Sequence, residues 1–231
     1  MCGRKTLTRD MVSIIEELAI DEWDDDDFIP SYNITPSQFS PILLGEANSR
    51  IVKKMKWGLI PNWSKNESIG SKMINARSET LTEKPSFQNL IHQKRCVVIS
   101  DGYFEWKREN NGSIPFYIFH PENKLLPMAG LWTTWESPNK TTTHSYTVIT
   151  TTPQKELSHI HNRMPVILNP MSIDEWIQCE STSLNQAMAT LIPYQKHLSF
   201  HPVSTLVNSP KNNLPDCIRS IKDSSTISLF S

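Results

Sequence analysis

The chain has 231 residues, of which 38% are hydrophobic and 20% charged, and its formal net charge is −1 at pH 7. This composition is typical of a globular protein with a sizeable core, and it argues against a disordered or fibrous chain. No apolar segment is long enough to cross a membrane and residues 1–11 lack the apolar core of a signal peptide, which argues against membrane and secreted proteins.

We therefore expect a cytoplasmic protein, associated with the nucleoid in a bacterium or nuclear in a eukaryote. The four cysteines are far apart in the sequence and include no CxxC pair. They are Cys2, Cys96, Cys179 and Cys217. Neither a disulfide framework nor a zinc site is expected, and the sequence predicts no metal and no other cofactor.

The acidic residues are unevenly distributed. Residues 21–27 hold six of the 24 acids and no base, which leaves 18 acids against 23 lysines and arginines elsewhere. We interpret this segment as a solvated acidic loop. The rest of the chain has a surplus of positive charge, so the overall charge does not exclude a nucleic-acid partner.

The N-terminal part of the chain predicts one helix followed by strands. Residues 8–18 have the spacing of an amphipathic helix with Thr8 as its N-cap. Its apolar face consists of Met11, Ile14, Ile15 and Leu18. After the acidic loop come SYNITPSQ (31–38) and the apolar run PILL (41–44). The alternation in KKMKWGL (53–59) predicts a half-buried strand with Trp57 on its buried side.

The remainder predicts a helix from Ser86, a series of strands, and two further short helices. The expected strands are 95–100, 101–107, 114–119, 124–132, 145–151 and 200–204, and the expected helices are 153–160 and 172–178. An ENNG turn (109–112) joins two of these strands as a hairpin. We expect an α+β protein, a single domain over residues 1–231, with a twisted, barrel-like antiparallel β core and flanking short helices.

The first four residues, MCGR, place a cysteine directly after the initiator methionine. Removal of Met1 would give Cys2 a free α-amine beside its thiol, and both groups are partly reactive near neutral pH. The amine condenses with an aldehyde to an imine, which the thiol closes to a thiazolidine. Gly3 allows close approach of the backbone, and Arg4 suits a phosphate. The alternative is that Cys2 is a small buried hydrophobic residue.

Two further segments are rich in functional groups. In INARSET (74–80), Asn75 can orient a polar group and Arg77 can pair with a phosphate, although the segment also fits a helix entry capped by Ser78. In DGYFEWK (101–107), period two places Glu105 in an aromatic strand, where burial raises the pKa of a carboxyl toward neutrality. The alternative is an exposed glutamate beside a lysine.

In HIHNRMP (159–165), His161 is a candidate proton shuttle and Arg163 a candidate phosphate ligand. The alternative is that the two histidines of this segment only cap the preceding helix. In KWGLIPNW, Trp57 alternates as a core residue, whereas Trp63 lies in a turn and is the better candidate for exposure and stacking on bases.

Seven motifs, in one order along nearly the whole chain, closely resemble those of the SRAP family (SOS response-associated peptidase domain). They are MCGR, SYNITPSQ, KWGLIPNW, INARSET, DGYFEWK, HIHNRMP and VNSPKNN. The resemblance implies a protein that shields abasic sites in single-stranded DNA through a covalent DNA–protein crosslink. The family fold, a twisted antiparallel β core with flanking helices, agrees with the α+β prediction.

The resemblance also implies a role for each matching residue. Cys2, N-terminal after removal of Met1, would form a thiazolidine with the aldehyde of the ring-opened sugar. Asn75 would hydrogen-bond near the reacting centre. Glu105 would be the acid/base group, and His161 would assist ring opening and reversal of the crosslink.

The DNA contacts implied by the resemblance surround this centre. The phosphate ligands would be Arg4, Arg77, Arg163 and Thr150. Pro36 and Trp63 match a region that packs against DNA and favours single strands or junctions of single-stranded and double-stranded DNA. A monomer is expected.

Two positions depart from the family pattern. The family commonly has HDRMP where this chain has Asn162, which weakens the orientation of His161 unless Asn162 makes the same hydrogen bond. Ser64 stands where a second aromatic residue often follows Trp63. Two other functions stay open: a thiol peptidase or amidohydrolase that processes its own Met1, and a noncovalent reader of modified DNA.

Overall fold

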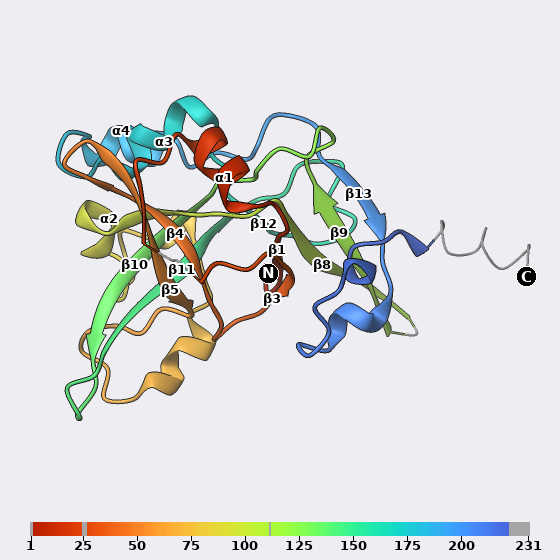
Figure 1. Ribbon diagram of the computed structural model, residues 1–231, viewed down its shortest axis with the longest axis horizontal. Helices are drawn as coiled ribbons and strands as arrows, with labels where there is room; N and C mark the ends of the chain where they lie inside the picture. The colour runs from red at the N-terminus through yellow and green to blue at the C-terminus, as the bar shows by residue number, and fades with distance from the viewer. Residues whose placement is uncertain (1, 25–26, 111, 222–231) are drawn as a thin grey trace, which may run out of the picture.

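The computed structural model describes residues 2–24, 27–110 and 112–221 (Figure 1). Its strands are β1 (Lys5–Leu7), β2 (Glu22–Asp24), β3 (Ser31–Ile34), β4 (Phe39–Glu46), β5 (Ser49–Trp57), β6 (Asn75–Arg77), β7 (Arg95–Val98), β8 (Gly102–Glu109), β9 (Gly112–Phe119), β10 (Met128–Glu136), β11 (Thr142–Thr151), β12 (Met164–Pro165) and β13 (Ser199–Pro202). The α-helices are α1 (Met11–Leu18), α2 (Leu90–Gln93), α3 (Ile173–Ile177) and α4 (Leu184–Ala189). Short 3₁₀ helices are η1 (Glu67–Lys72), η2 (Ser78–Thr80), η3 (Pro170–Ser172), η4 (Thr205–Asn208) and η5 (Pro215–Cys217).

The larger sheet closes into a barrel. Its strand order is β12-β11-β10-β7-β4-β5-β2, and an additional pairing of β11 with β5 joins the two sides of the sheet. Strands β11, β10, β7, β4 and β5 therefore form a continuous ring around the main core. Helix α2 contacts β7 and β10, and α3 contacts β4 and β7, on the opposite side of the molecule from β13 (Figure 1). The predicted α+β fold with a barrel-like β core is confirmed.

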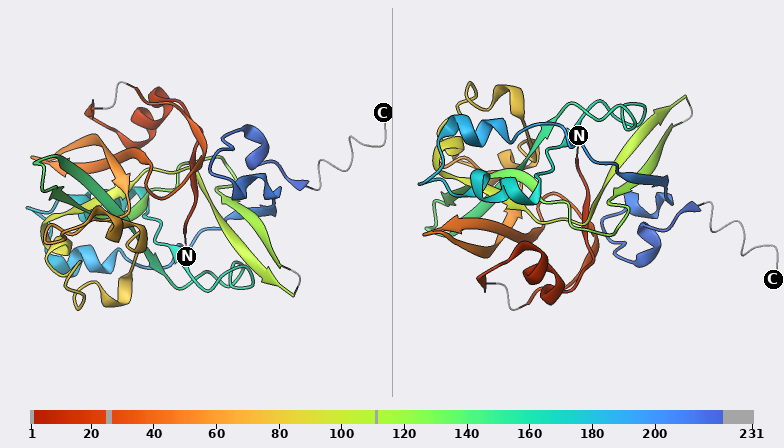
Figure 2. Two further views of the ribbon diagram at one scale, coloured as in Figure 1. Left: turned by 90° about the horizontal axis from the view of Figure 1, so that it is seen from below. Right: turned by 90° about the horizontal axis from the view of Figure 1, so that it is seen from above.

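A second sheet, in the order β13-β9-β8-β1-β3, lies beside the barrel. The hairpin of β8 and β9 projects from the barrel next to the C-terminal segment, and the N-terminal strand runs between the barrel and this hairpin (Figure 2). In β1, Lys5 is opposite Tyr103 of β8 and Ile34 of β3. This pairing on both sides fixes the residues that precede β1, including Cys2.

The sheet is more mixed than the antiparallel prediction. Strands β5 and β6 both pair with β11 in parallel, and β2 pairs with β5 in parallel. Residues 22–24 of the predicted acidic loop form β2, whereas residues 25–26 lie outside the described residues. The predicted ENNG turn includes residue 111, which also lies outside them, but Glu109 and Gly112 on either side pair as predicted.

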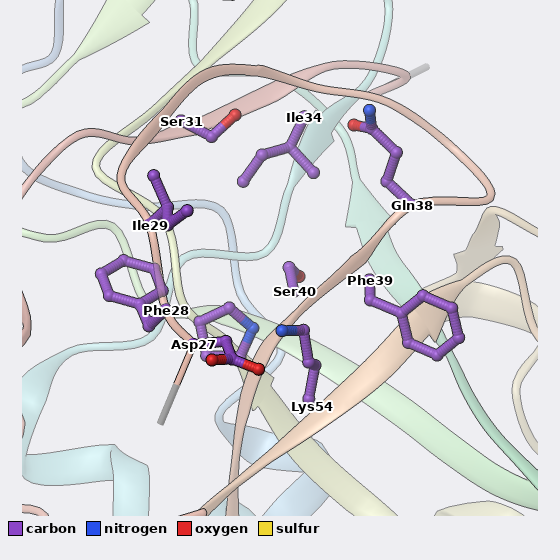
Figure 3. A pocket seen from close by; sticks show the side chains of 10 residues that line it. Asp27, Phe28, Ile29, Ser31, Ile34, Gln38, Phe39, Ser40 and Lys54 are labelled. Carbon is purple, nitrogen blue, oxygen red and sulfur yellow. The ribbon is translucent and has the colours of Figure 1, made fainter. Parts of the chain in front are cut away.

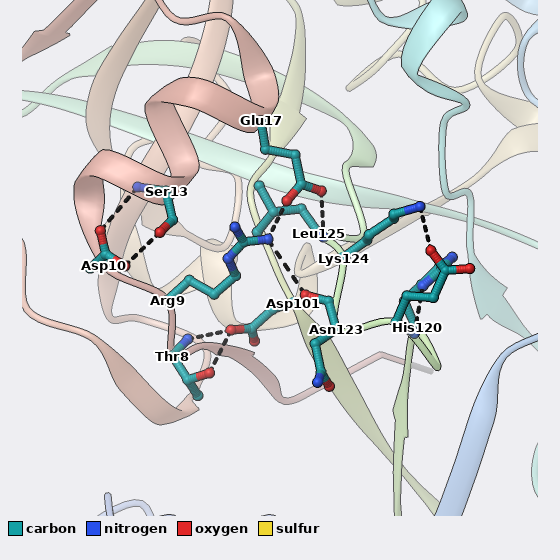
Figure 4. Close-up of polar contacts among 11 residues, drawn as sticks. Thr8, Arg9, Asp10, Ser13, Glu17, Asp101, His120, Asn123, Lys124 and Leu125 are labelled. Carbon is teal, nitrogen blue, oxygen red and sulfur yellow. Dashed lines mark hydrogen bonds and ion pairs between the residues drawn. The ribbon is translucent and has the colours of Figure 1, made fainter.

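Helix α1 confirms the predicted periodicity but not its cap. Asp10, not Thr8, is the N-cap, and its side chain accepts a hydrogen bond from the Ser13 backbone N–H at 3.0 Å (Figure 4). The Thr8 hydroxyl instead donates to Asp101 at 2.7 Å. Thr8 therefore ties the start of α1 to the beginning of β8, which a local capping rule does not anticipate. Met11, assigned to the apolar face, is 39% exposed.

Two predicted helices are shorter than expected or absent. The helix predicted from Ser86 is α-helical only over Leu90–Gln93. Residues 153–160 form consecutive turns in which the N–H groups of Leu157 and Ile160 bond three residues back. Both side chains are buried, so packing in the core is achieved by turns without a full helix.

Residues 207–212 form a clamp on the N-terminal strand, because their carbonyls accept hydrogen bonds from Arg4 and Asn33. The buried Asn33 side-chain amide lies 2.7 Å from the Asn212 carbonyl and 3.1 Å from the Ser209 carbonyl, and its Oδ1 accepts from Arg4 at 2.9 Å. Arg4 also donates to the Asn208 carbonyl at 2.8 Å. Two segments about two hundred residues apart in the sequence are thereby joined at one buried amide.

Replacement of Asn33 by alanine is expected to lower the free energy of unfolding by about 3 kcal/mol, because it removes one acceptor of Arg4 and the donor that the Ser209 and Asn212 carbonyls share. Urea denaturation measures this change. Asn213→Ala is the control, since Asn213 bonds the exposed backbone of Tyr32 at 2.7 Å. An Asn33→Ala protein no less stable than the Asn213→Ala protein would show that the clamp contributes little.

No α-helix within the described ranges combines the length and apolar character that a membrane crossing requires.

Candidate functional site

Cys2 lies at the centre of the candidate site and is fully buried. Asn75, the first residue of β6, donates from its side-chain amide to the Cys2 carbonyl at 2.8 Å. The parallel pairing of β6 with β11 places Asn75 opposite Val148 and so fixes the position of this amide. The Asn75 Oδ1 is also buried and has no hydrogen-bond partner among the described residues. The amide thus holds the Cys2 backbone and keeps an acceptor available beside it.

Glu105 lies on β8 and is 3% exposed. Burial raises the pKa of its carboxyl to about 7, as the aromatic setting of the strand predicted. Burial, assisted by the nearby Glu105 charge, raises the pKa of the Cys2 thiol to about 12. At neutral pH, Glu105 can therefore both donate and accept a proton, whereas the buried thiol stays protonated.

His161 lies next to this carboxyl, with Nε2 4.0 Å from Glu105 Oε2. Its Nδ1 lies 3.1 Å from the Arg163 backbone nitrogen and 3.3 Å from the Arg163 carbonyl oxygen, so the Arg163 backbone holds the ring with Nε2 on the side of Glu105. Burial lowers the pKa of His161. The exposed Asn162 forms no side-chain hydrogen bond with a described residue, so the Arg163 backbone orients His161 instead.

The Arg163 guanidinium forms a two-point ion pair with Glu79, at 2.6 and 2.9 Å. It also bonds the Thr150 carbonyl. The Thr150 hydroxyl is buried and donates to the Ala76 carbonyl at 3.3 Å. The structure thus places Thr150 behind Arg163, where it supports the arginine and does not face solvent. Glu79 was missed by the sequence analysis, although it lies in the INARSET motif.

The other two predicted phosphate ligands, Arg4 and Arg77, differ in the number of hydrogen bonds that they form within the protein. Arg4 is held by Asn33 and by two backbone carbonyls, and its guanidinium stacks 6.0 Å from the Trp106 ring centre. Arg77 is exposed and has no side-chain hydrogen bond or ion pair with a described residue. Of these arginines, Arg77 is the one whose charge is fully available to a ligand.

The aromatic residues behave as predicted. Trp57 is 1% exposed and stacks on Tyr146, whereas Trp63 is 60% exposed. The Ser64 backbone carbonyl accepts a hydrogen bond from the Trp135 indole at 2.8 Å, so at the position after Trp63 it is the backbone that forms this contact. Pro36 is half-buried in the loop between β3 and β4.

A cavity of about 400 Å³ lies beside the loop of Pro36. Residues 27–29, 31, 34, 38–41 and 54 provide its lining, with Phe28 and Lys54 near one end and Gln38 near the other (Figure 3). Phe39 and Ile29 on its rim are 54% and 78% exposed. The cavity adds apolar surface to the region predicted to pack against DNA, but Cys2 does not line it.

Within the described ranges, no group of three or more histidine, cysteine, aspartate or glutamate side chains is arranged to hold a metal ion. The reactive groups of the site are the amine and thiol of Cys2, the carboxyl of Glu105 and the imidazole of His161, which suit nucleophilic and acid/base chemistry.

The model of one family, SOS response associated peptidase (SRAP), matches residues 1–210. The chain belongs to the SRAP family. A relative from Bacillus subtilis (strain 168), abasic site processing protein YoqW, is 41% identical over 223 residues, covering 95% of this chain and all of that protein. Abasic site processing protein HMCES of Xenopus tropicalis is 38% identical over 230 residues, covering 86% of this chain and 68% of the relative.

Two solved structures have the same fold as this chain. A protein from Bacteroides thetaiotaomicron has a TM-score of 0.84 and 25% identity, covering 95% of this chain and 99% of that one. A protein from Bordetella bronchiseptica, with a TM-score of 0.75 and 21% identity over 88% of this chain and the whole of that one, shares the fold.

Proposed function

We propose that this SRAP protein processes abasic sites in single-stranded DNA by capturing them covalently through Cys2. The observation that carries the proposal is that the backbone of the buried Cys2 is held by the Asn75 amide, within electrostatic range of a buried Glu105 carboxyl whose pKa is about 7. The names of the relatives, which are abasic site processing proteins, support the same substrate.

Capture requires proton transfer at two stages before the thiol reacts, the opening of the sugar ring and the loss of water. The abasic sugar is mostly a closed hemiacetal, so His161 and Glu105 open it by donating a proton to the ring oxygen and accepting one from the anomeric hydroxyl. After removal of Met1, the Cys2 amine adds to the aldehyde, and Glu105 protonates the hydroxyl that leaves as water, which gives an imine. The thiol then adds across the C=N bond: sulfur bonds to carbon, and the thiol proton is transferred to nitrogen.

The product is a thiazolidine, in which no imine remains to promote β-elimination of the DNA strand. An abasic site carries no base, so the site can be small and no stacked base has to be flipped out. Covalent capture therefore protects the strand from scission. Such a protein acts where the DNA is, in the nucleoid of a bacterium or the nucleus of a eukaryote.

DNA phosphates would contact Arg4, Arg77 and Arg163, with Pro36 and Trp63 packing against the strand or against a junction with double-stranded DNA. We expect a monomer to suffice, because every proposed catalytic residue comes from one chain.

Arg77→Ala is expected to weaken binding of an intact single-stranded oligonucleotide and to reduce the slope of log K against log salt by about 0.7, the loss of one phosphate contact. Fluorescence anisotropy between low and moderate salt measures both. Arg219→Ala is the control, because Arg219 is paired with Asp216 at 2.9 Å in the C-terminal region. A slope equal to that of the wild type would remove Arg77 from the DNA interface.

A second candidate function is self-processing, in which the same residues release Met1. Cys2 lies next to a carboxyl that can exchange protons near neutral pH, which is the pairing that an N-terminal nucleophile needs. Intact mass spectrometry of the wild type and of a Glu105→Gln variant, both produced in a translation system without methionine aminopeptidase, tests it. Retention of Met1 in the variant alone supports self-processing, and loss of Met1 from both proteins contradicts it.

The test of the main proposal is a denaturing gel with an oligonucleotide that carries one abasic site. A heat-stable shifted band, in a protein that lacks the mass of Met1, supports covalent capture. Unmodified oligonucleotide is the control. Tight binding without a heat-stable band contradicts it and favours a noncovalent reader.

A further inference from the structure

The hydroxyl of Tyr103 is buried, and no described residue forms a hydrogen bond with it. The side chain is fully buried, and its oxygen bonds to no described residue. Buried phenols usually find a partner, because desolvation of an unpaired hydroxyl costs free energy. Two other tyrosines of this protein follow that rule: Tyr146 bonds Ser40 at 2.9 Å, and Tyr117 bonds Thr6 at 3.1 Å.

Tyr103 belongs to the neighbourhood of Cys2 and Glu105. It precedes Glu105 by two residues on β8, so both side chains project from the same face of the strand. Tyr103 and Cys2 belong to the same buried cluster. Burial raises the pKa of Tyr103, and the charges of Glu105 and Cys2 raise it further, which places both groups within electrostatic range of the phenol. Tyr103 therefore stays protonated and is available as a donor.

The step that needs such a donor is attack by the sulfur. Among the described residues, the Cys2 Sγ forms one weak hydrogen bond, to the Arg4 carbonyl at 3.9 Å, and this acceptor cannot stabilise negative charge on sulfur. As the thiol gives up its proton and adds to the imine, charge develops on sulfur in a buried setting where it is poorly solvated. The Tyr103 hydroxyl can donate a hydrogen bond to the charged sulfur without first breaking a hydrogen bond to another described residue.

We propose that the Tyr103 hydroxyl donates a hydrogen bond to the Cys2 sulfur as it closes the thiazolidine ring. This inference rests on the proposed covalent function. Tyr103 keeps its own proton throughout: the S–C bond forms, the π pair of C=N becomes the nitrogen lone pair, and the thiol proton moves to nitrogen. Formation of the imine, which involves the amine alone, does not require Tyr103.

The experiment separates the two stages. The protein is mixed with an abasic-site oligonucleotide and quenched at intervals with borohydride, which reduces an imine but leaves a thiazolidine unchanged. After proteolysis, the N-terminal peptide–DNA adduct is weighed, because reduction adds two hydrogen masses. Tyr103→Phe is expected to form imine at the wild-type rate and to close the ring at least about tenfold more slowly.

Thermal unfolding distinguishes this role from a structural one. Tyr103→Phe removes a hydroxyl with no partner, so the Tm is expected to be unchanged or higher. The matched control is Tyr117→Phe, which removes the hydroxyl that bonds Thr6 and is expected to lower the Tm while closing the ring at the wild-type rate. Wild-type ring closure by Tyr103→Phe, or a fall in its Tm like that of the control, overturns the inference. Absence of any adduct with the wild type overturns the proposed function itself.

Discussion

Cys2→Ser is expected to abolish the heat-stable crosslink to an abasic-site oligonucleotide. The serine amine still condenses with the aldehyde, but a hydroxyl closes a five-membered ring far less readily than a thiol, so the adduct stays a hydrolysable imine. We expect no band after heating and a band only when borohydride is added before heating. A denaturing gel run with and without borohydride measures both outcomes.

Cys179→Ser is the matched control for this experiment. Cys179 is half-buried and so more accessible than Cys2, yet it lies outside the candidate site. Its replacement is expected to leave the crosslink intact. A Cys2→Ser protein that still gives a heat-stable band would refute capture through the Cys2 thiol. Loss of the band in Cys179→Ser would assign the capture to Cys179 instead.

Glu105→Gln is expected to slow crosslink formation about 10² to 10⁴-fold, the usual contribution of a positioned acid/base group. The pKa of about 7 also predicts a pH dependence in the wild type, with the rate changing through neutrality as Glu105 titrates. The glutamine variant is expected to lose that inflection. Rates measured by quenched gels from pH 5 to pH 9 test it, with Glu109→Gln, on the same strand, as the control.

The same substitution has an expected effect on stability, with a definite sign. The pKa of Glu105 is raised from 4.5 to about 7, so the folded protein binds more protons than the unfolded chain between these values. Stability of the wild type therefore falls as pH rises through this window, by roughly 3 kcal/mol in all. Glu105→Gln should be more stable than the wild type at pH 8 and similar to it at pH 4. If the variant and the wild type were equally stable at pH 8 as well as at pH 4, the result would contradict a buried Glu105 carboxyl that ionises in this range.

Local pattern predicted much of the fold and the chemical identity of the site. The aromatic strand DGYFEWK correctly predicted a buried Glu105 and the raised pKa of its carboxyl. The turn around Pro61 correctly predicted an exposed Trp63. The SRAP motifs identified the family, which the comparisons confirm. The roles assigned to Cys2 and its neighbours stay predictions.

What the sequence could not predict depends on contacts between distant segments. The ion pair of Arg163 with Glu79 spans 84 positions, and the parallel pairing of β6 with β11 brings Asn75 to Val148. The buried position of Thr150 follows from that pairing. Likewise, the bond from Thr8 to Asp101 outweighs a local preference for capping. Short-range rules contain no information on such partners.

The clamp of Arg4 and Asn33 has a consequence for protein synthesis. Cys2 leaves the ribosome well before the carbonyls of residues 207–212 that secure the strand behind it, because Arg4 and Asn208 are 204 positions apart. A methionine aminopeptidase can therefore reach the nascent N-terminus while it is still unfolded. The segment adopts its buried, ordered position only after residues 207–212 have been made, so a nascent chain that stops before them cannot assemble the candidate site.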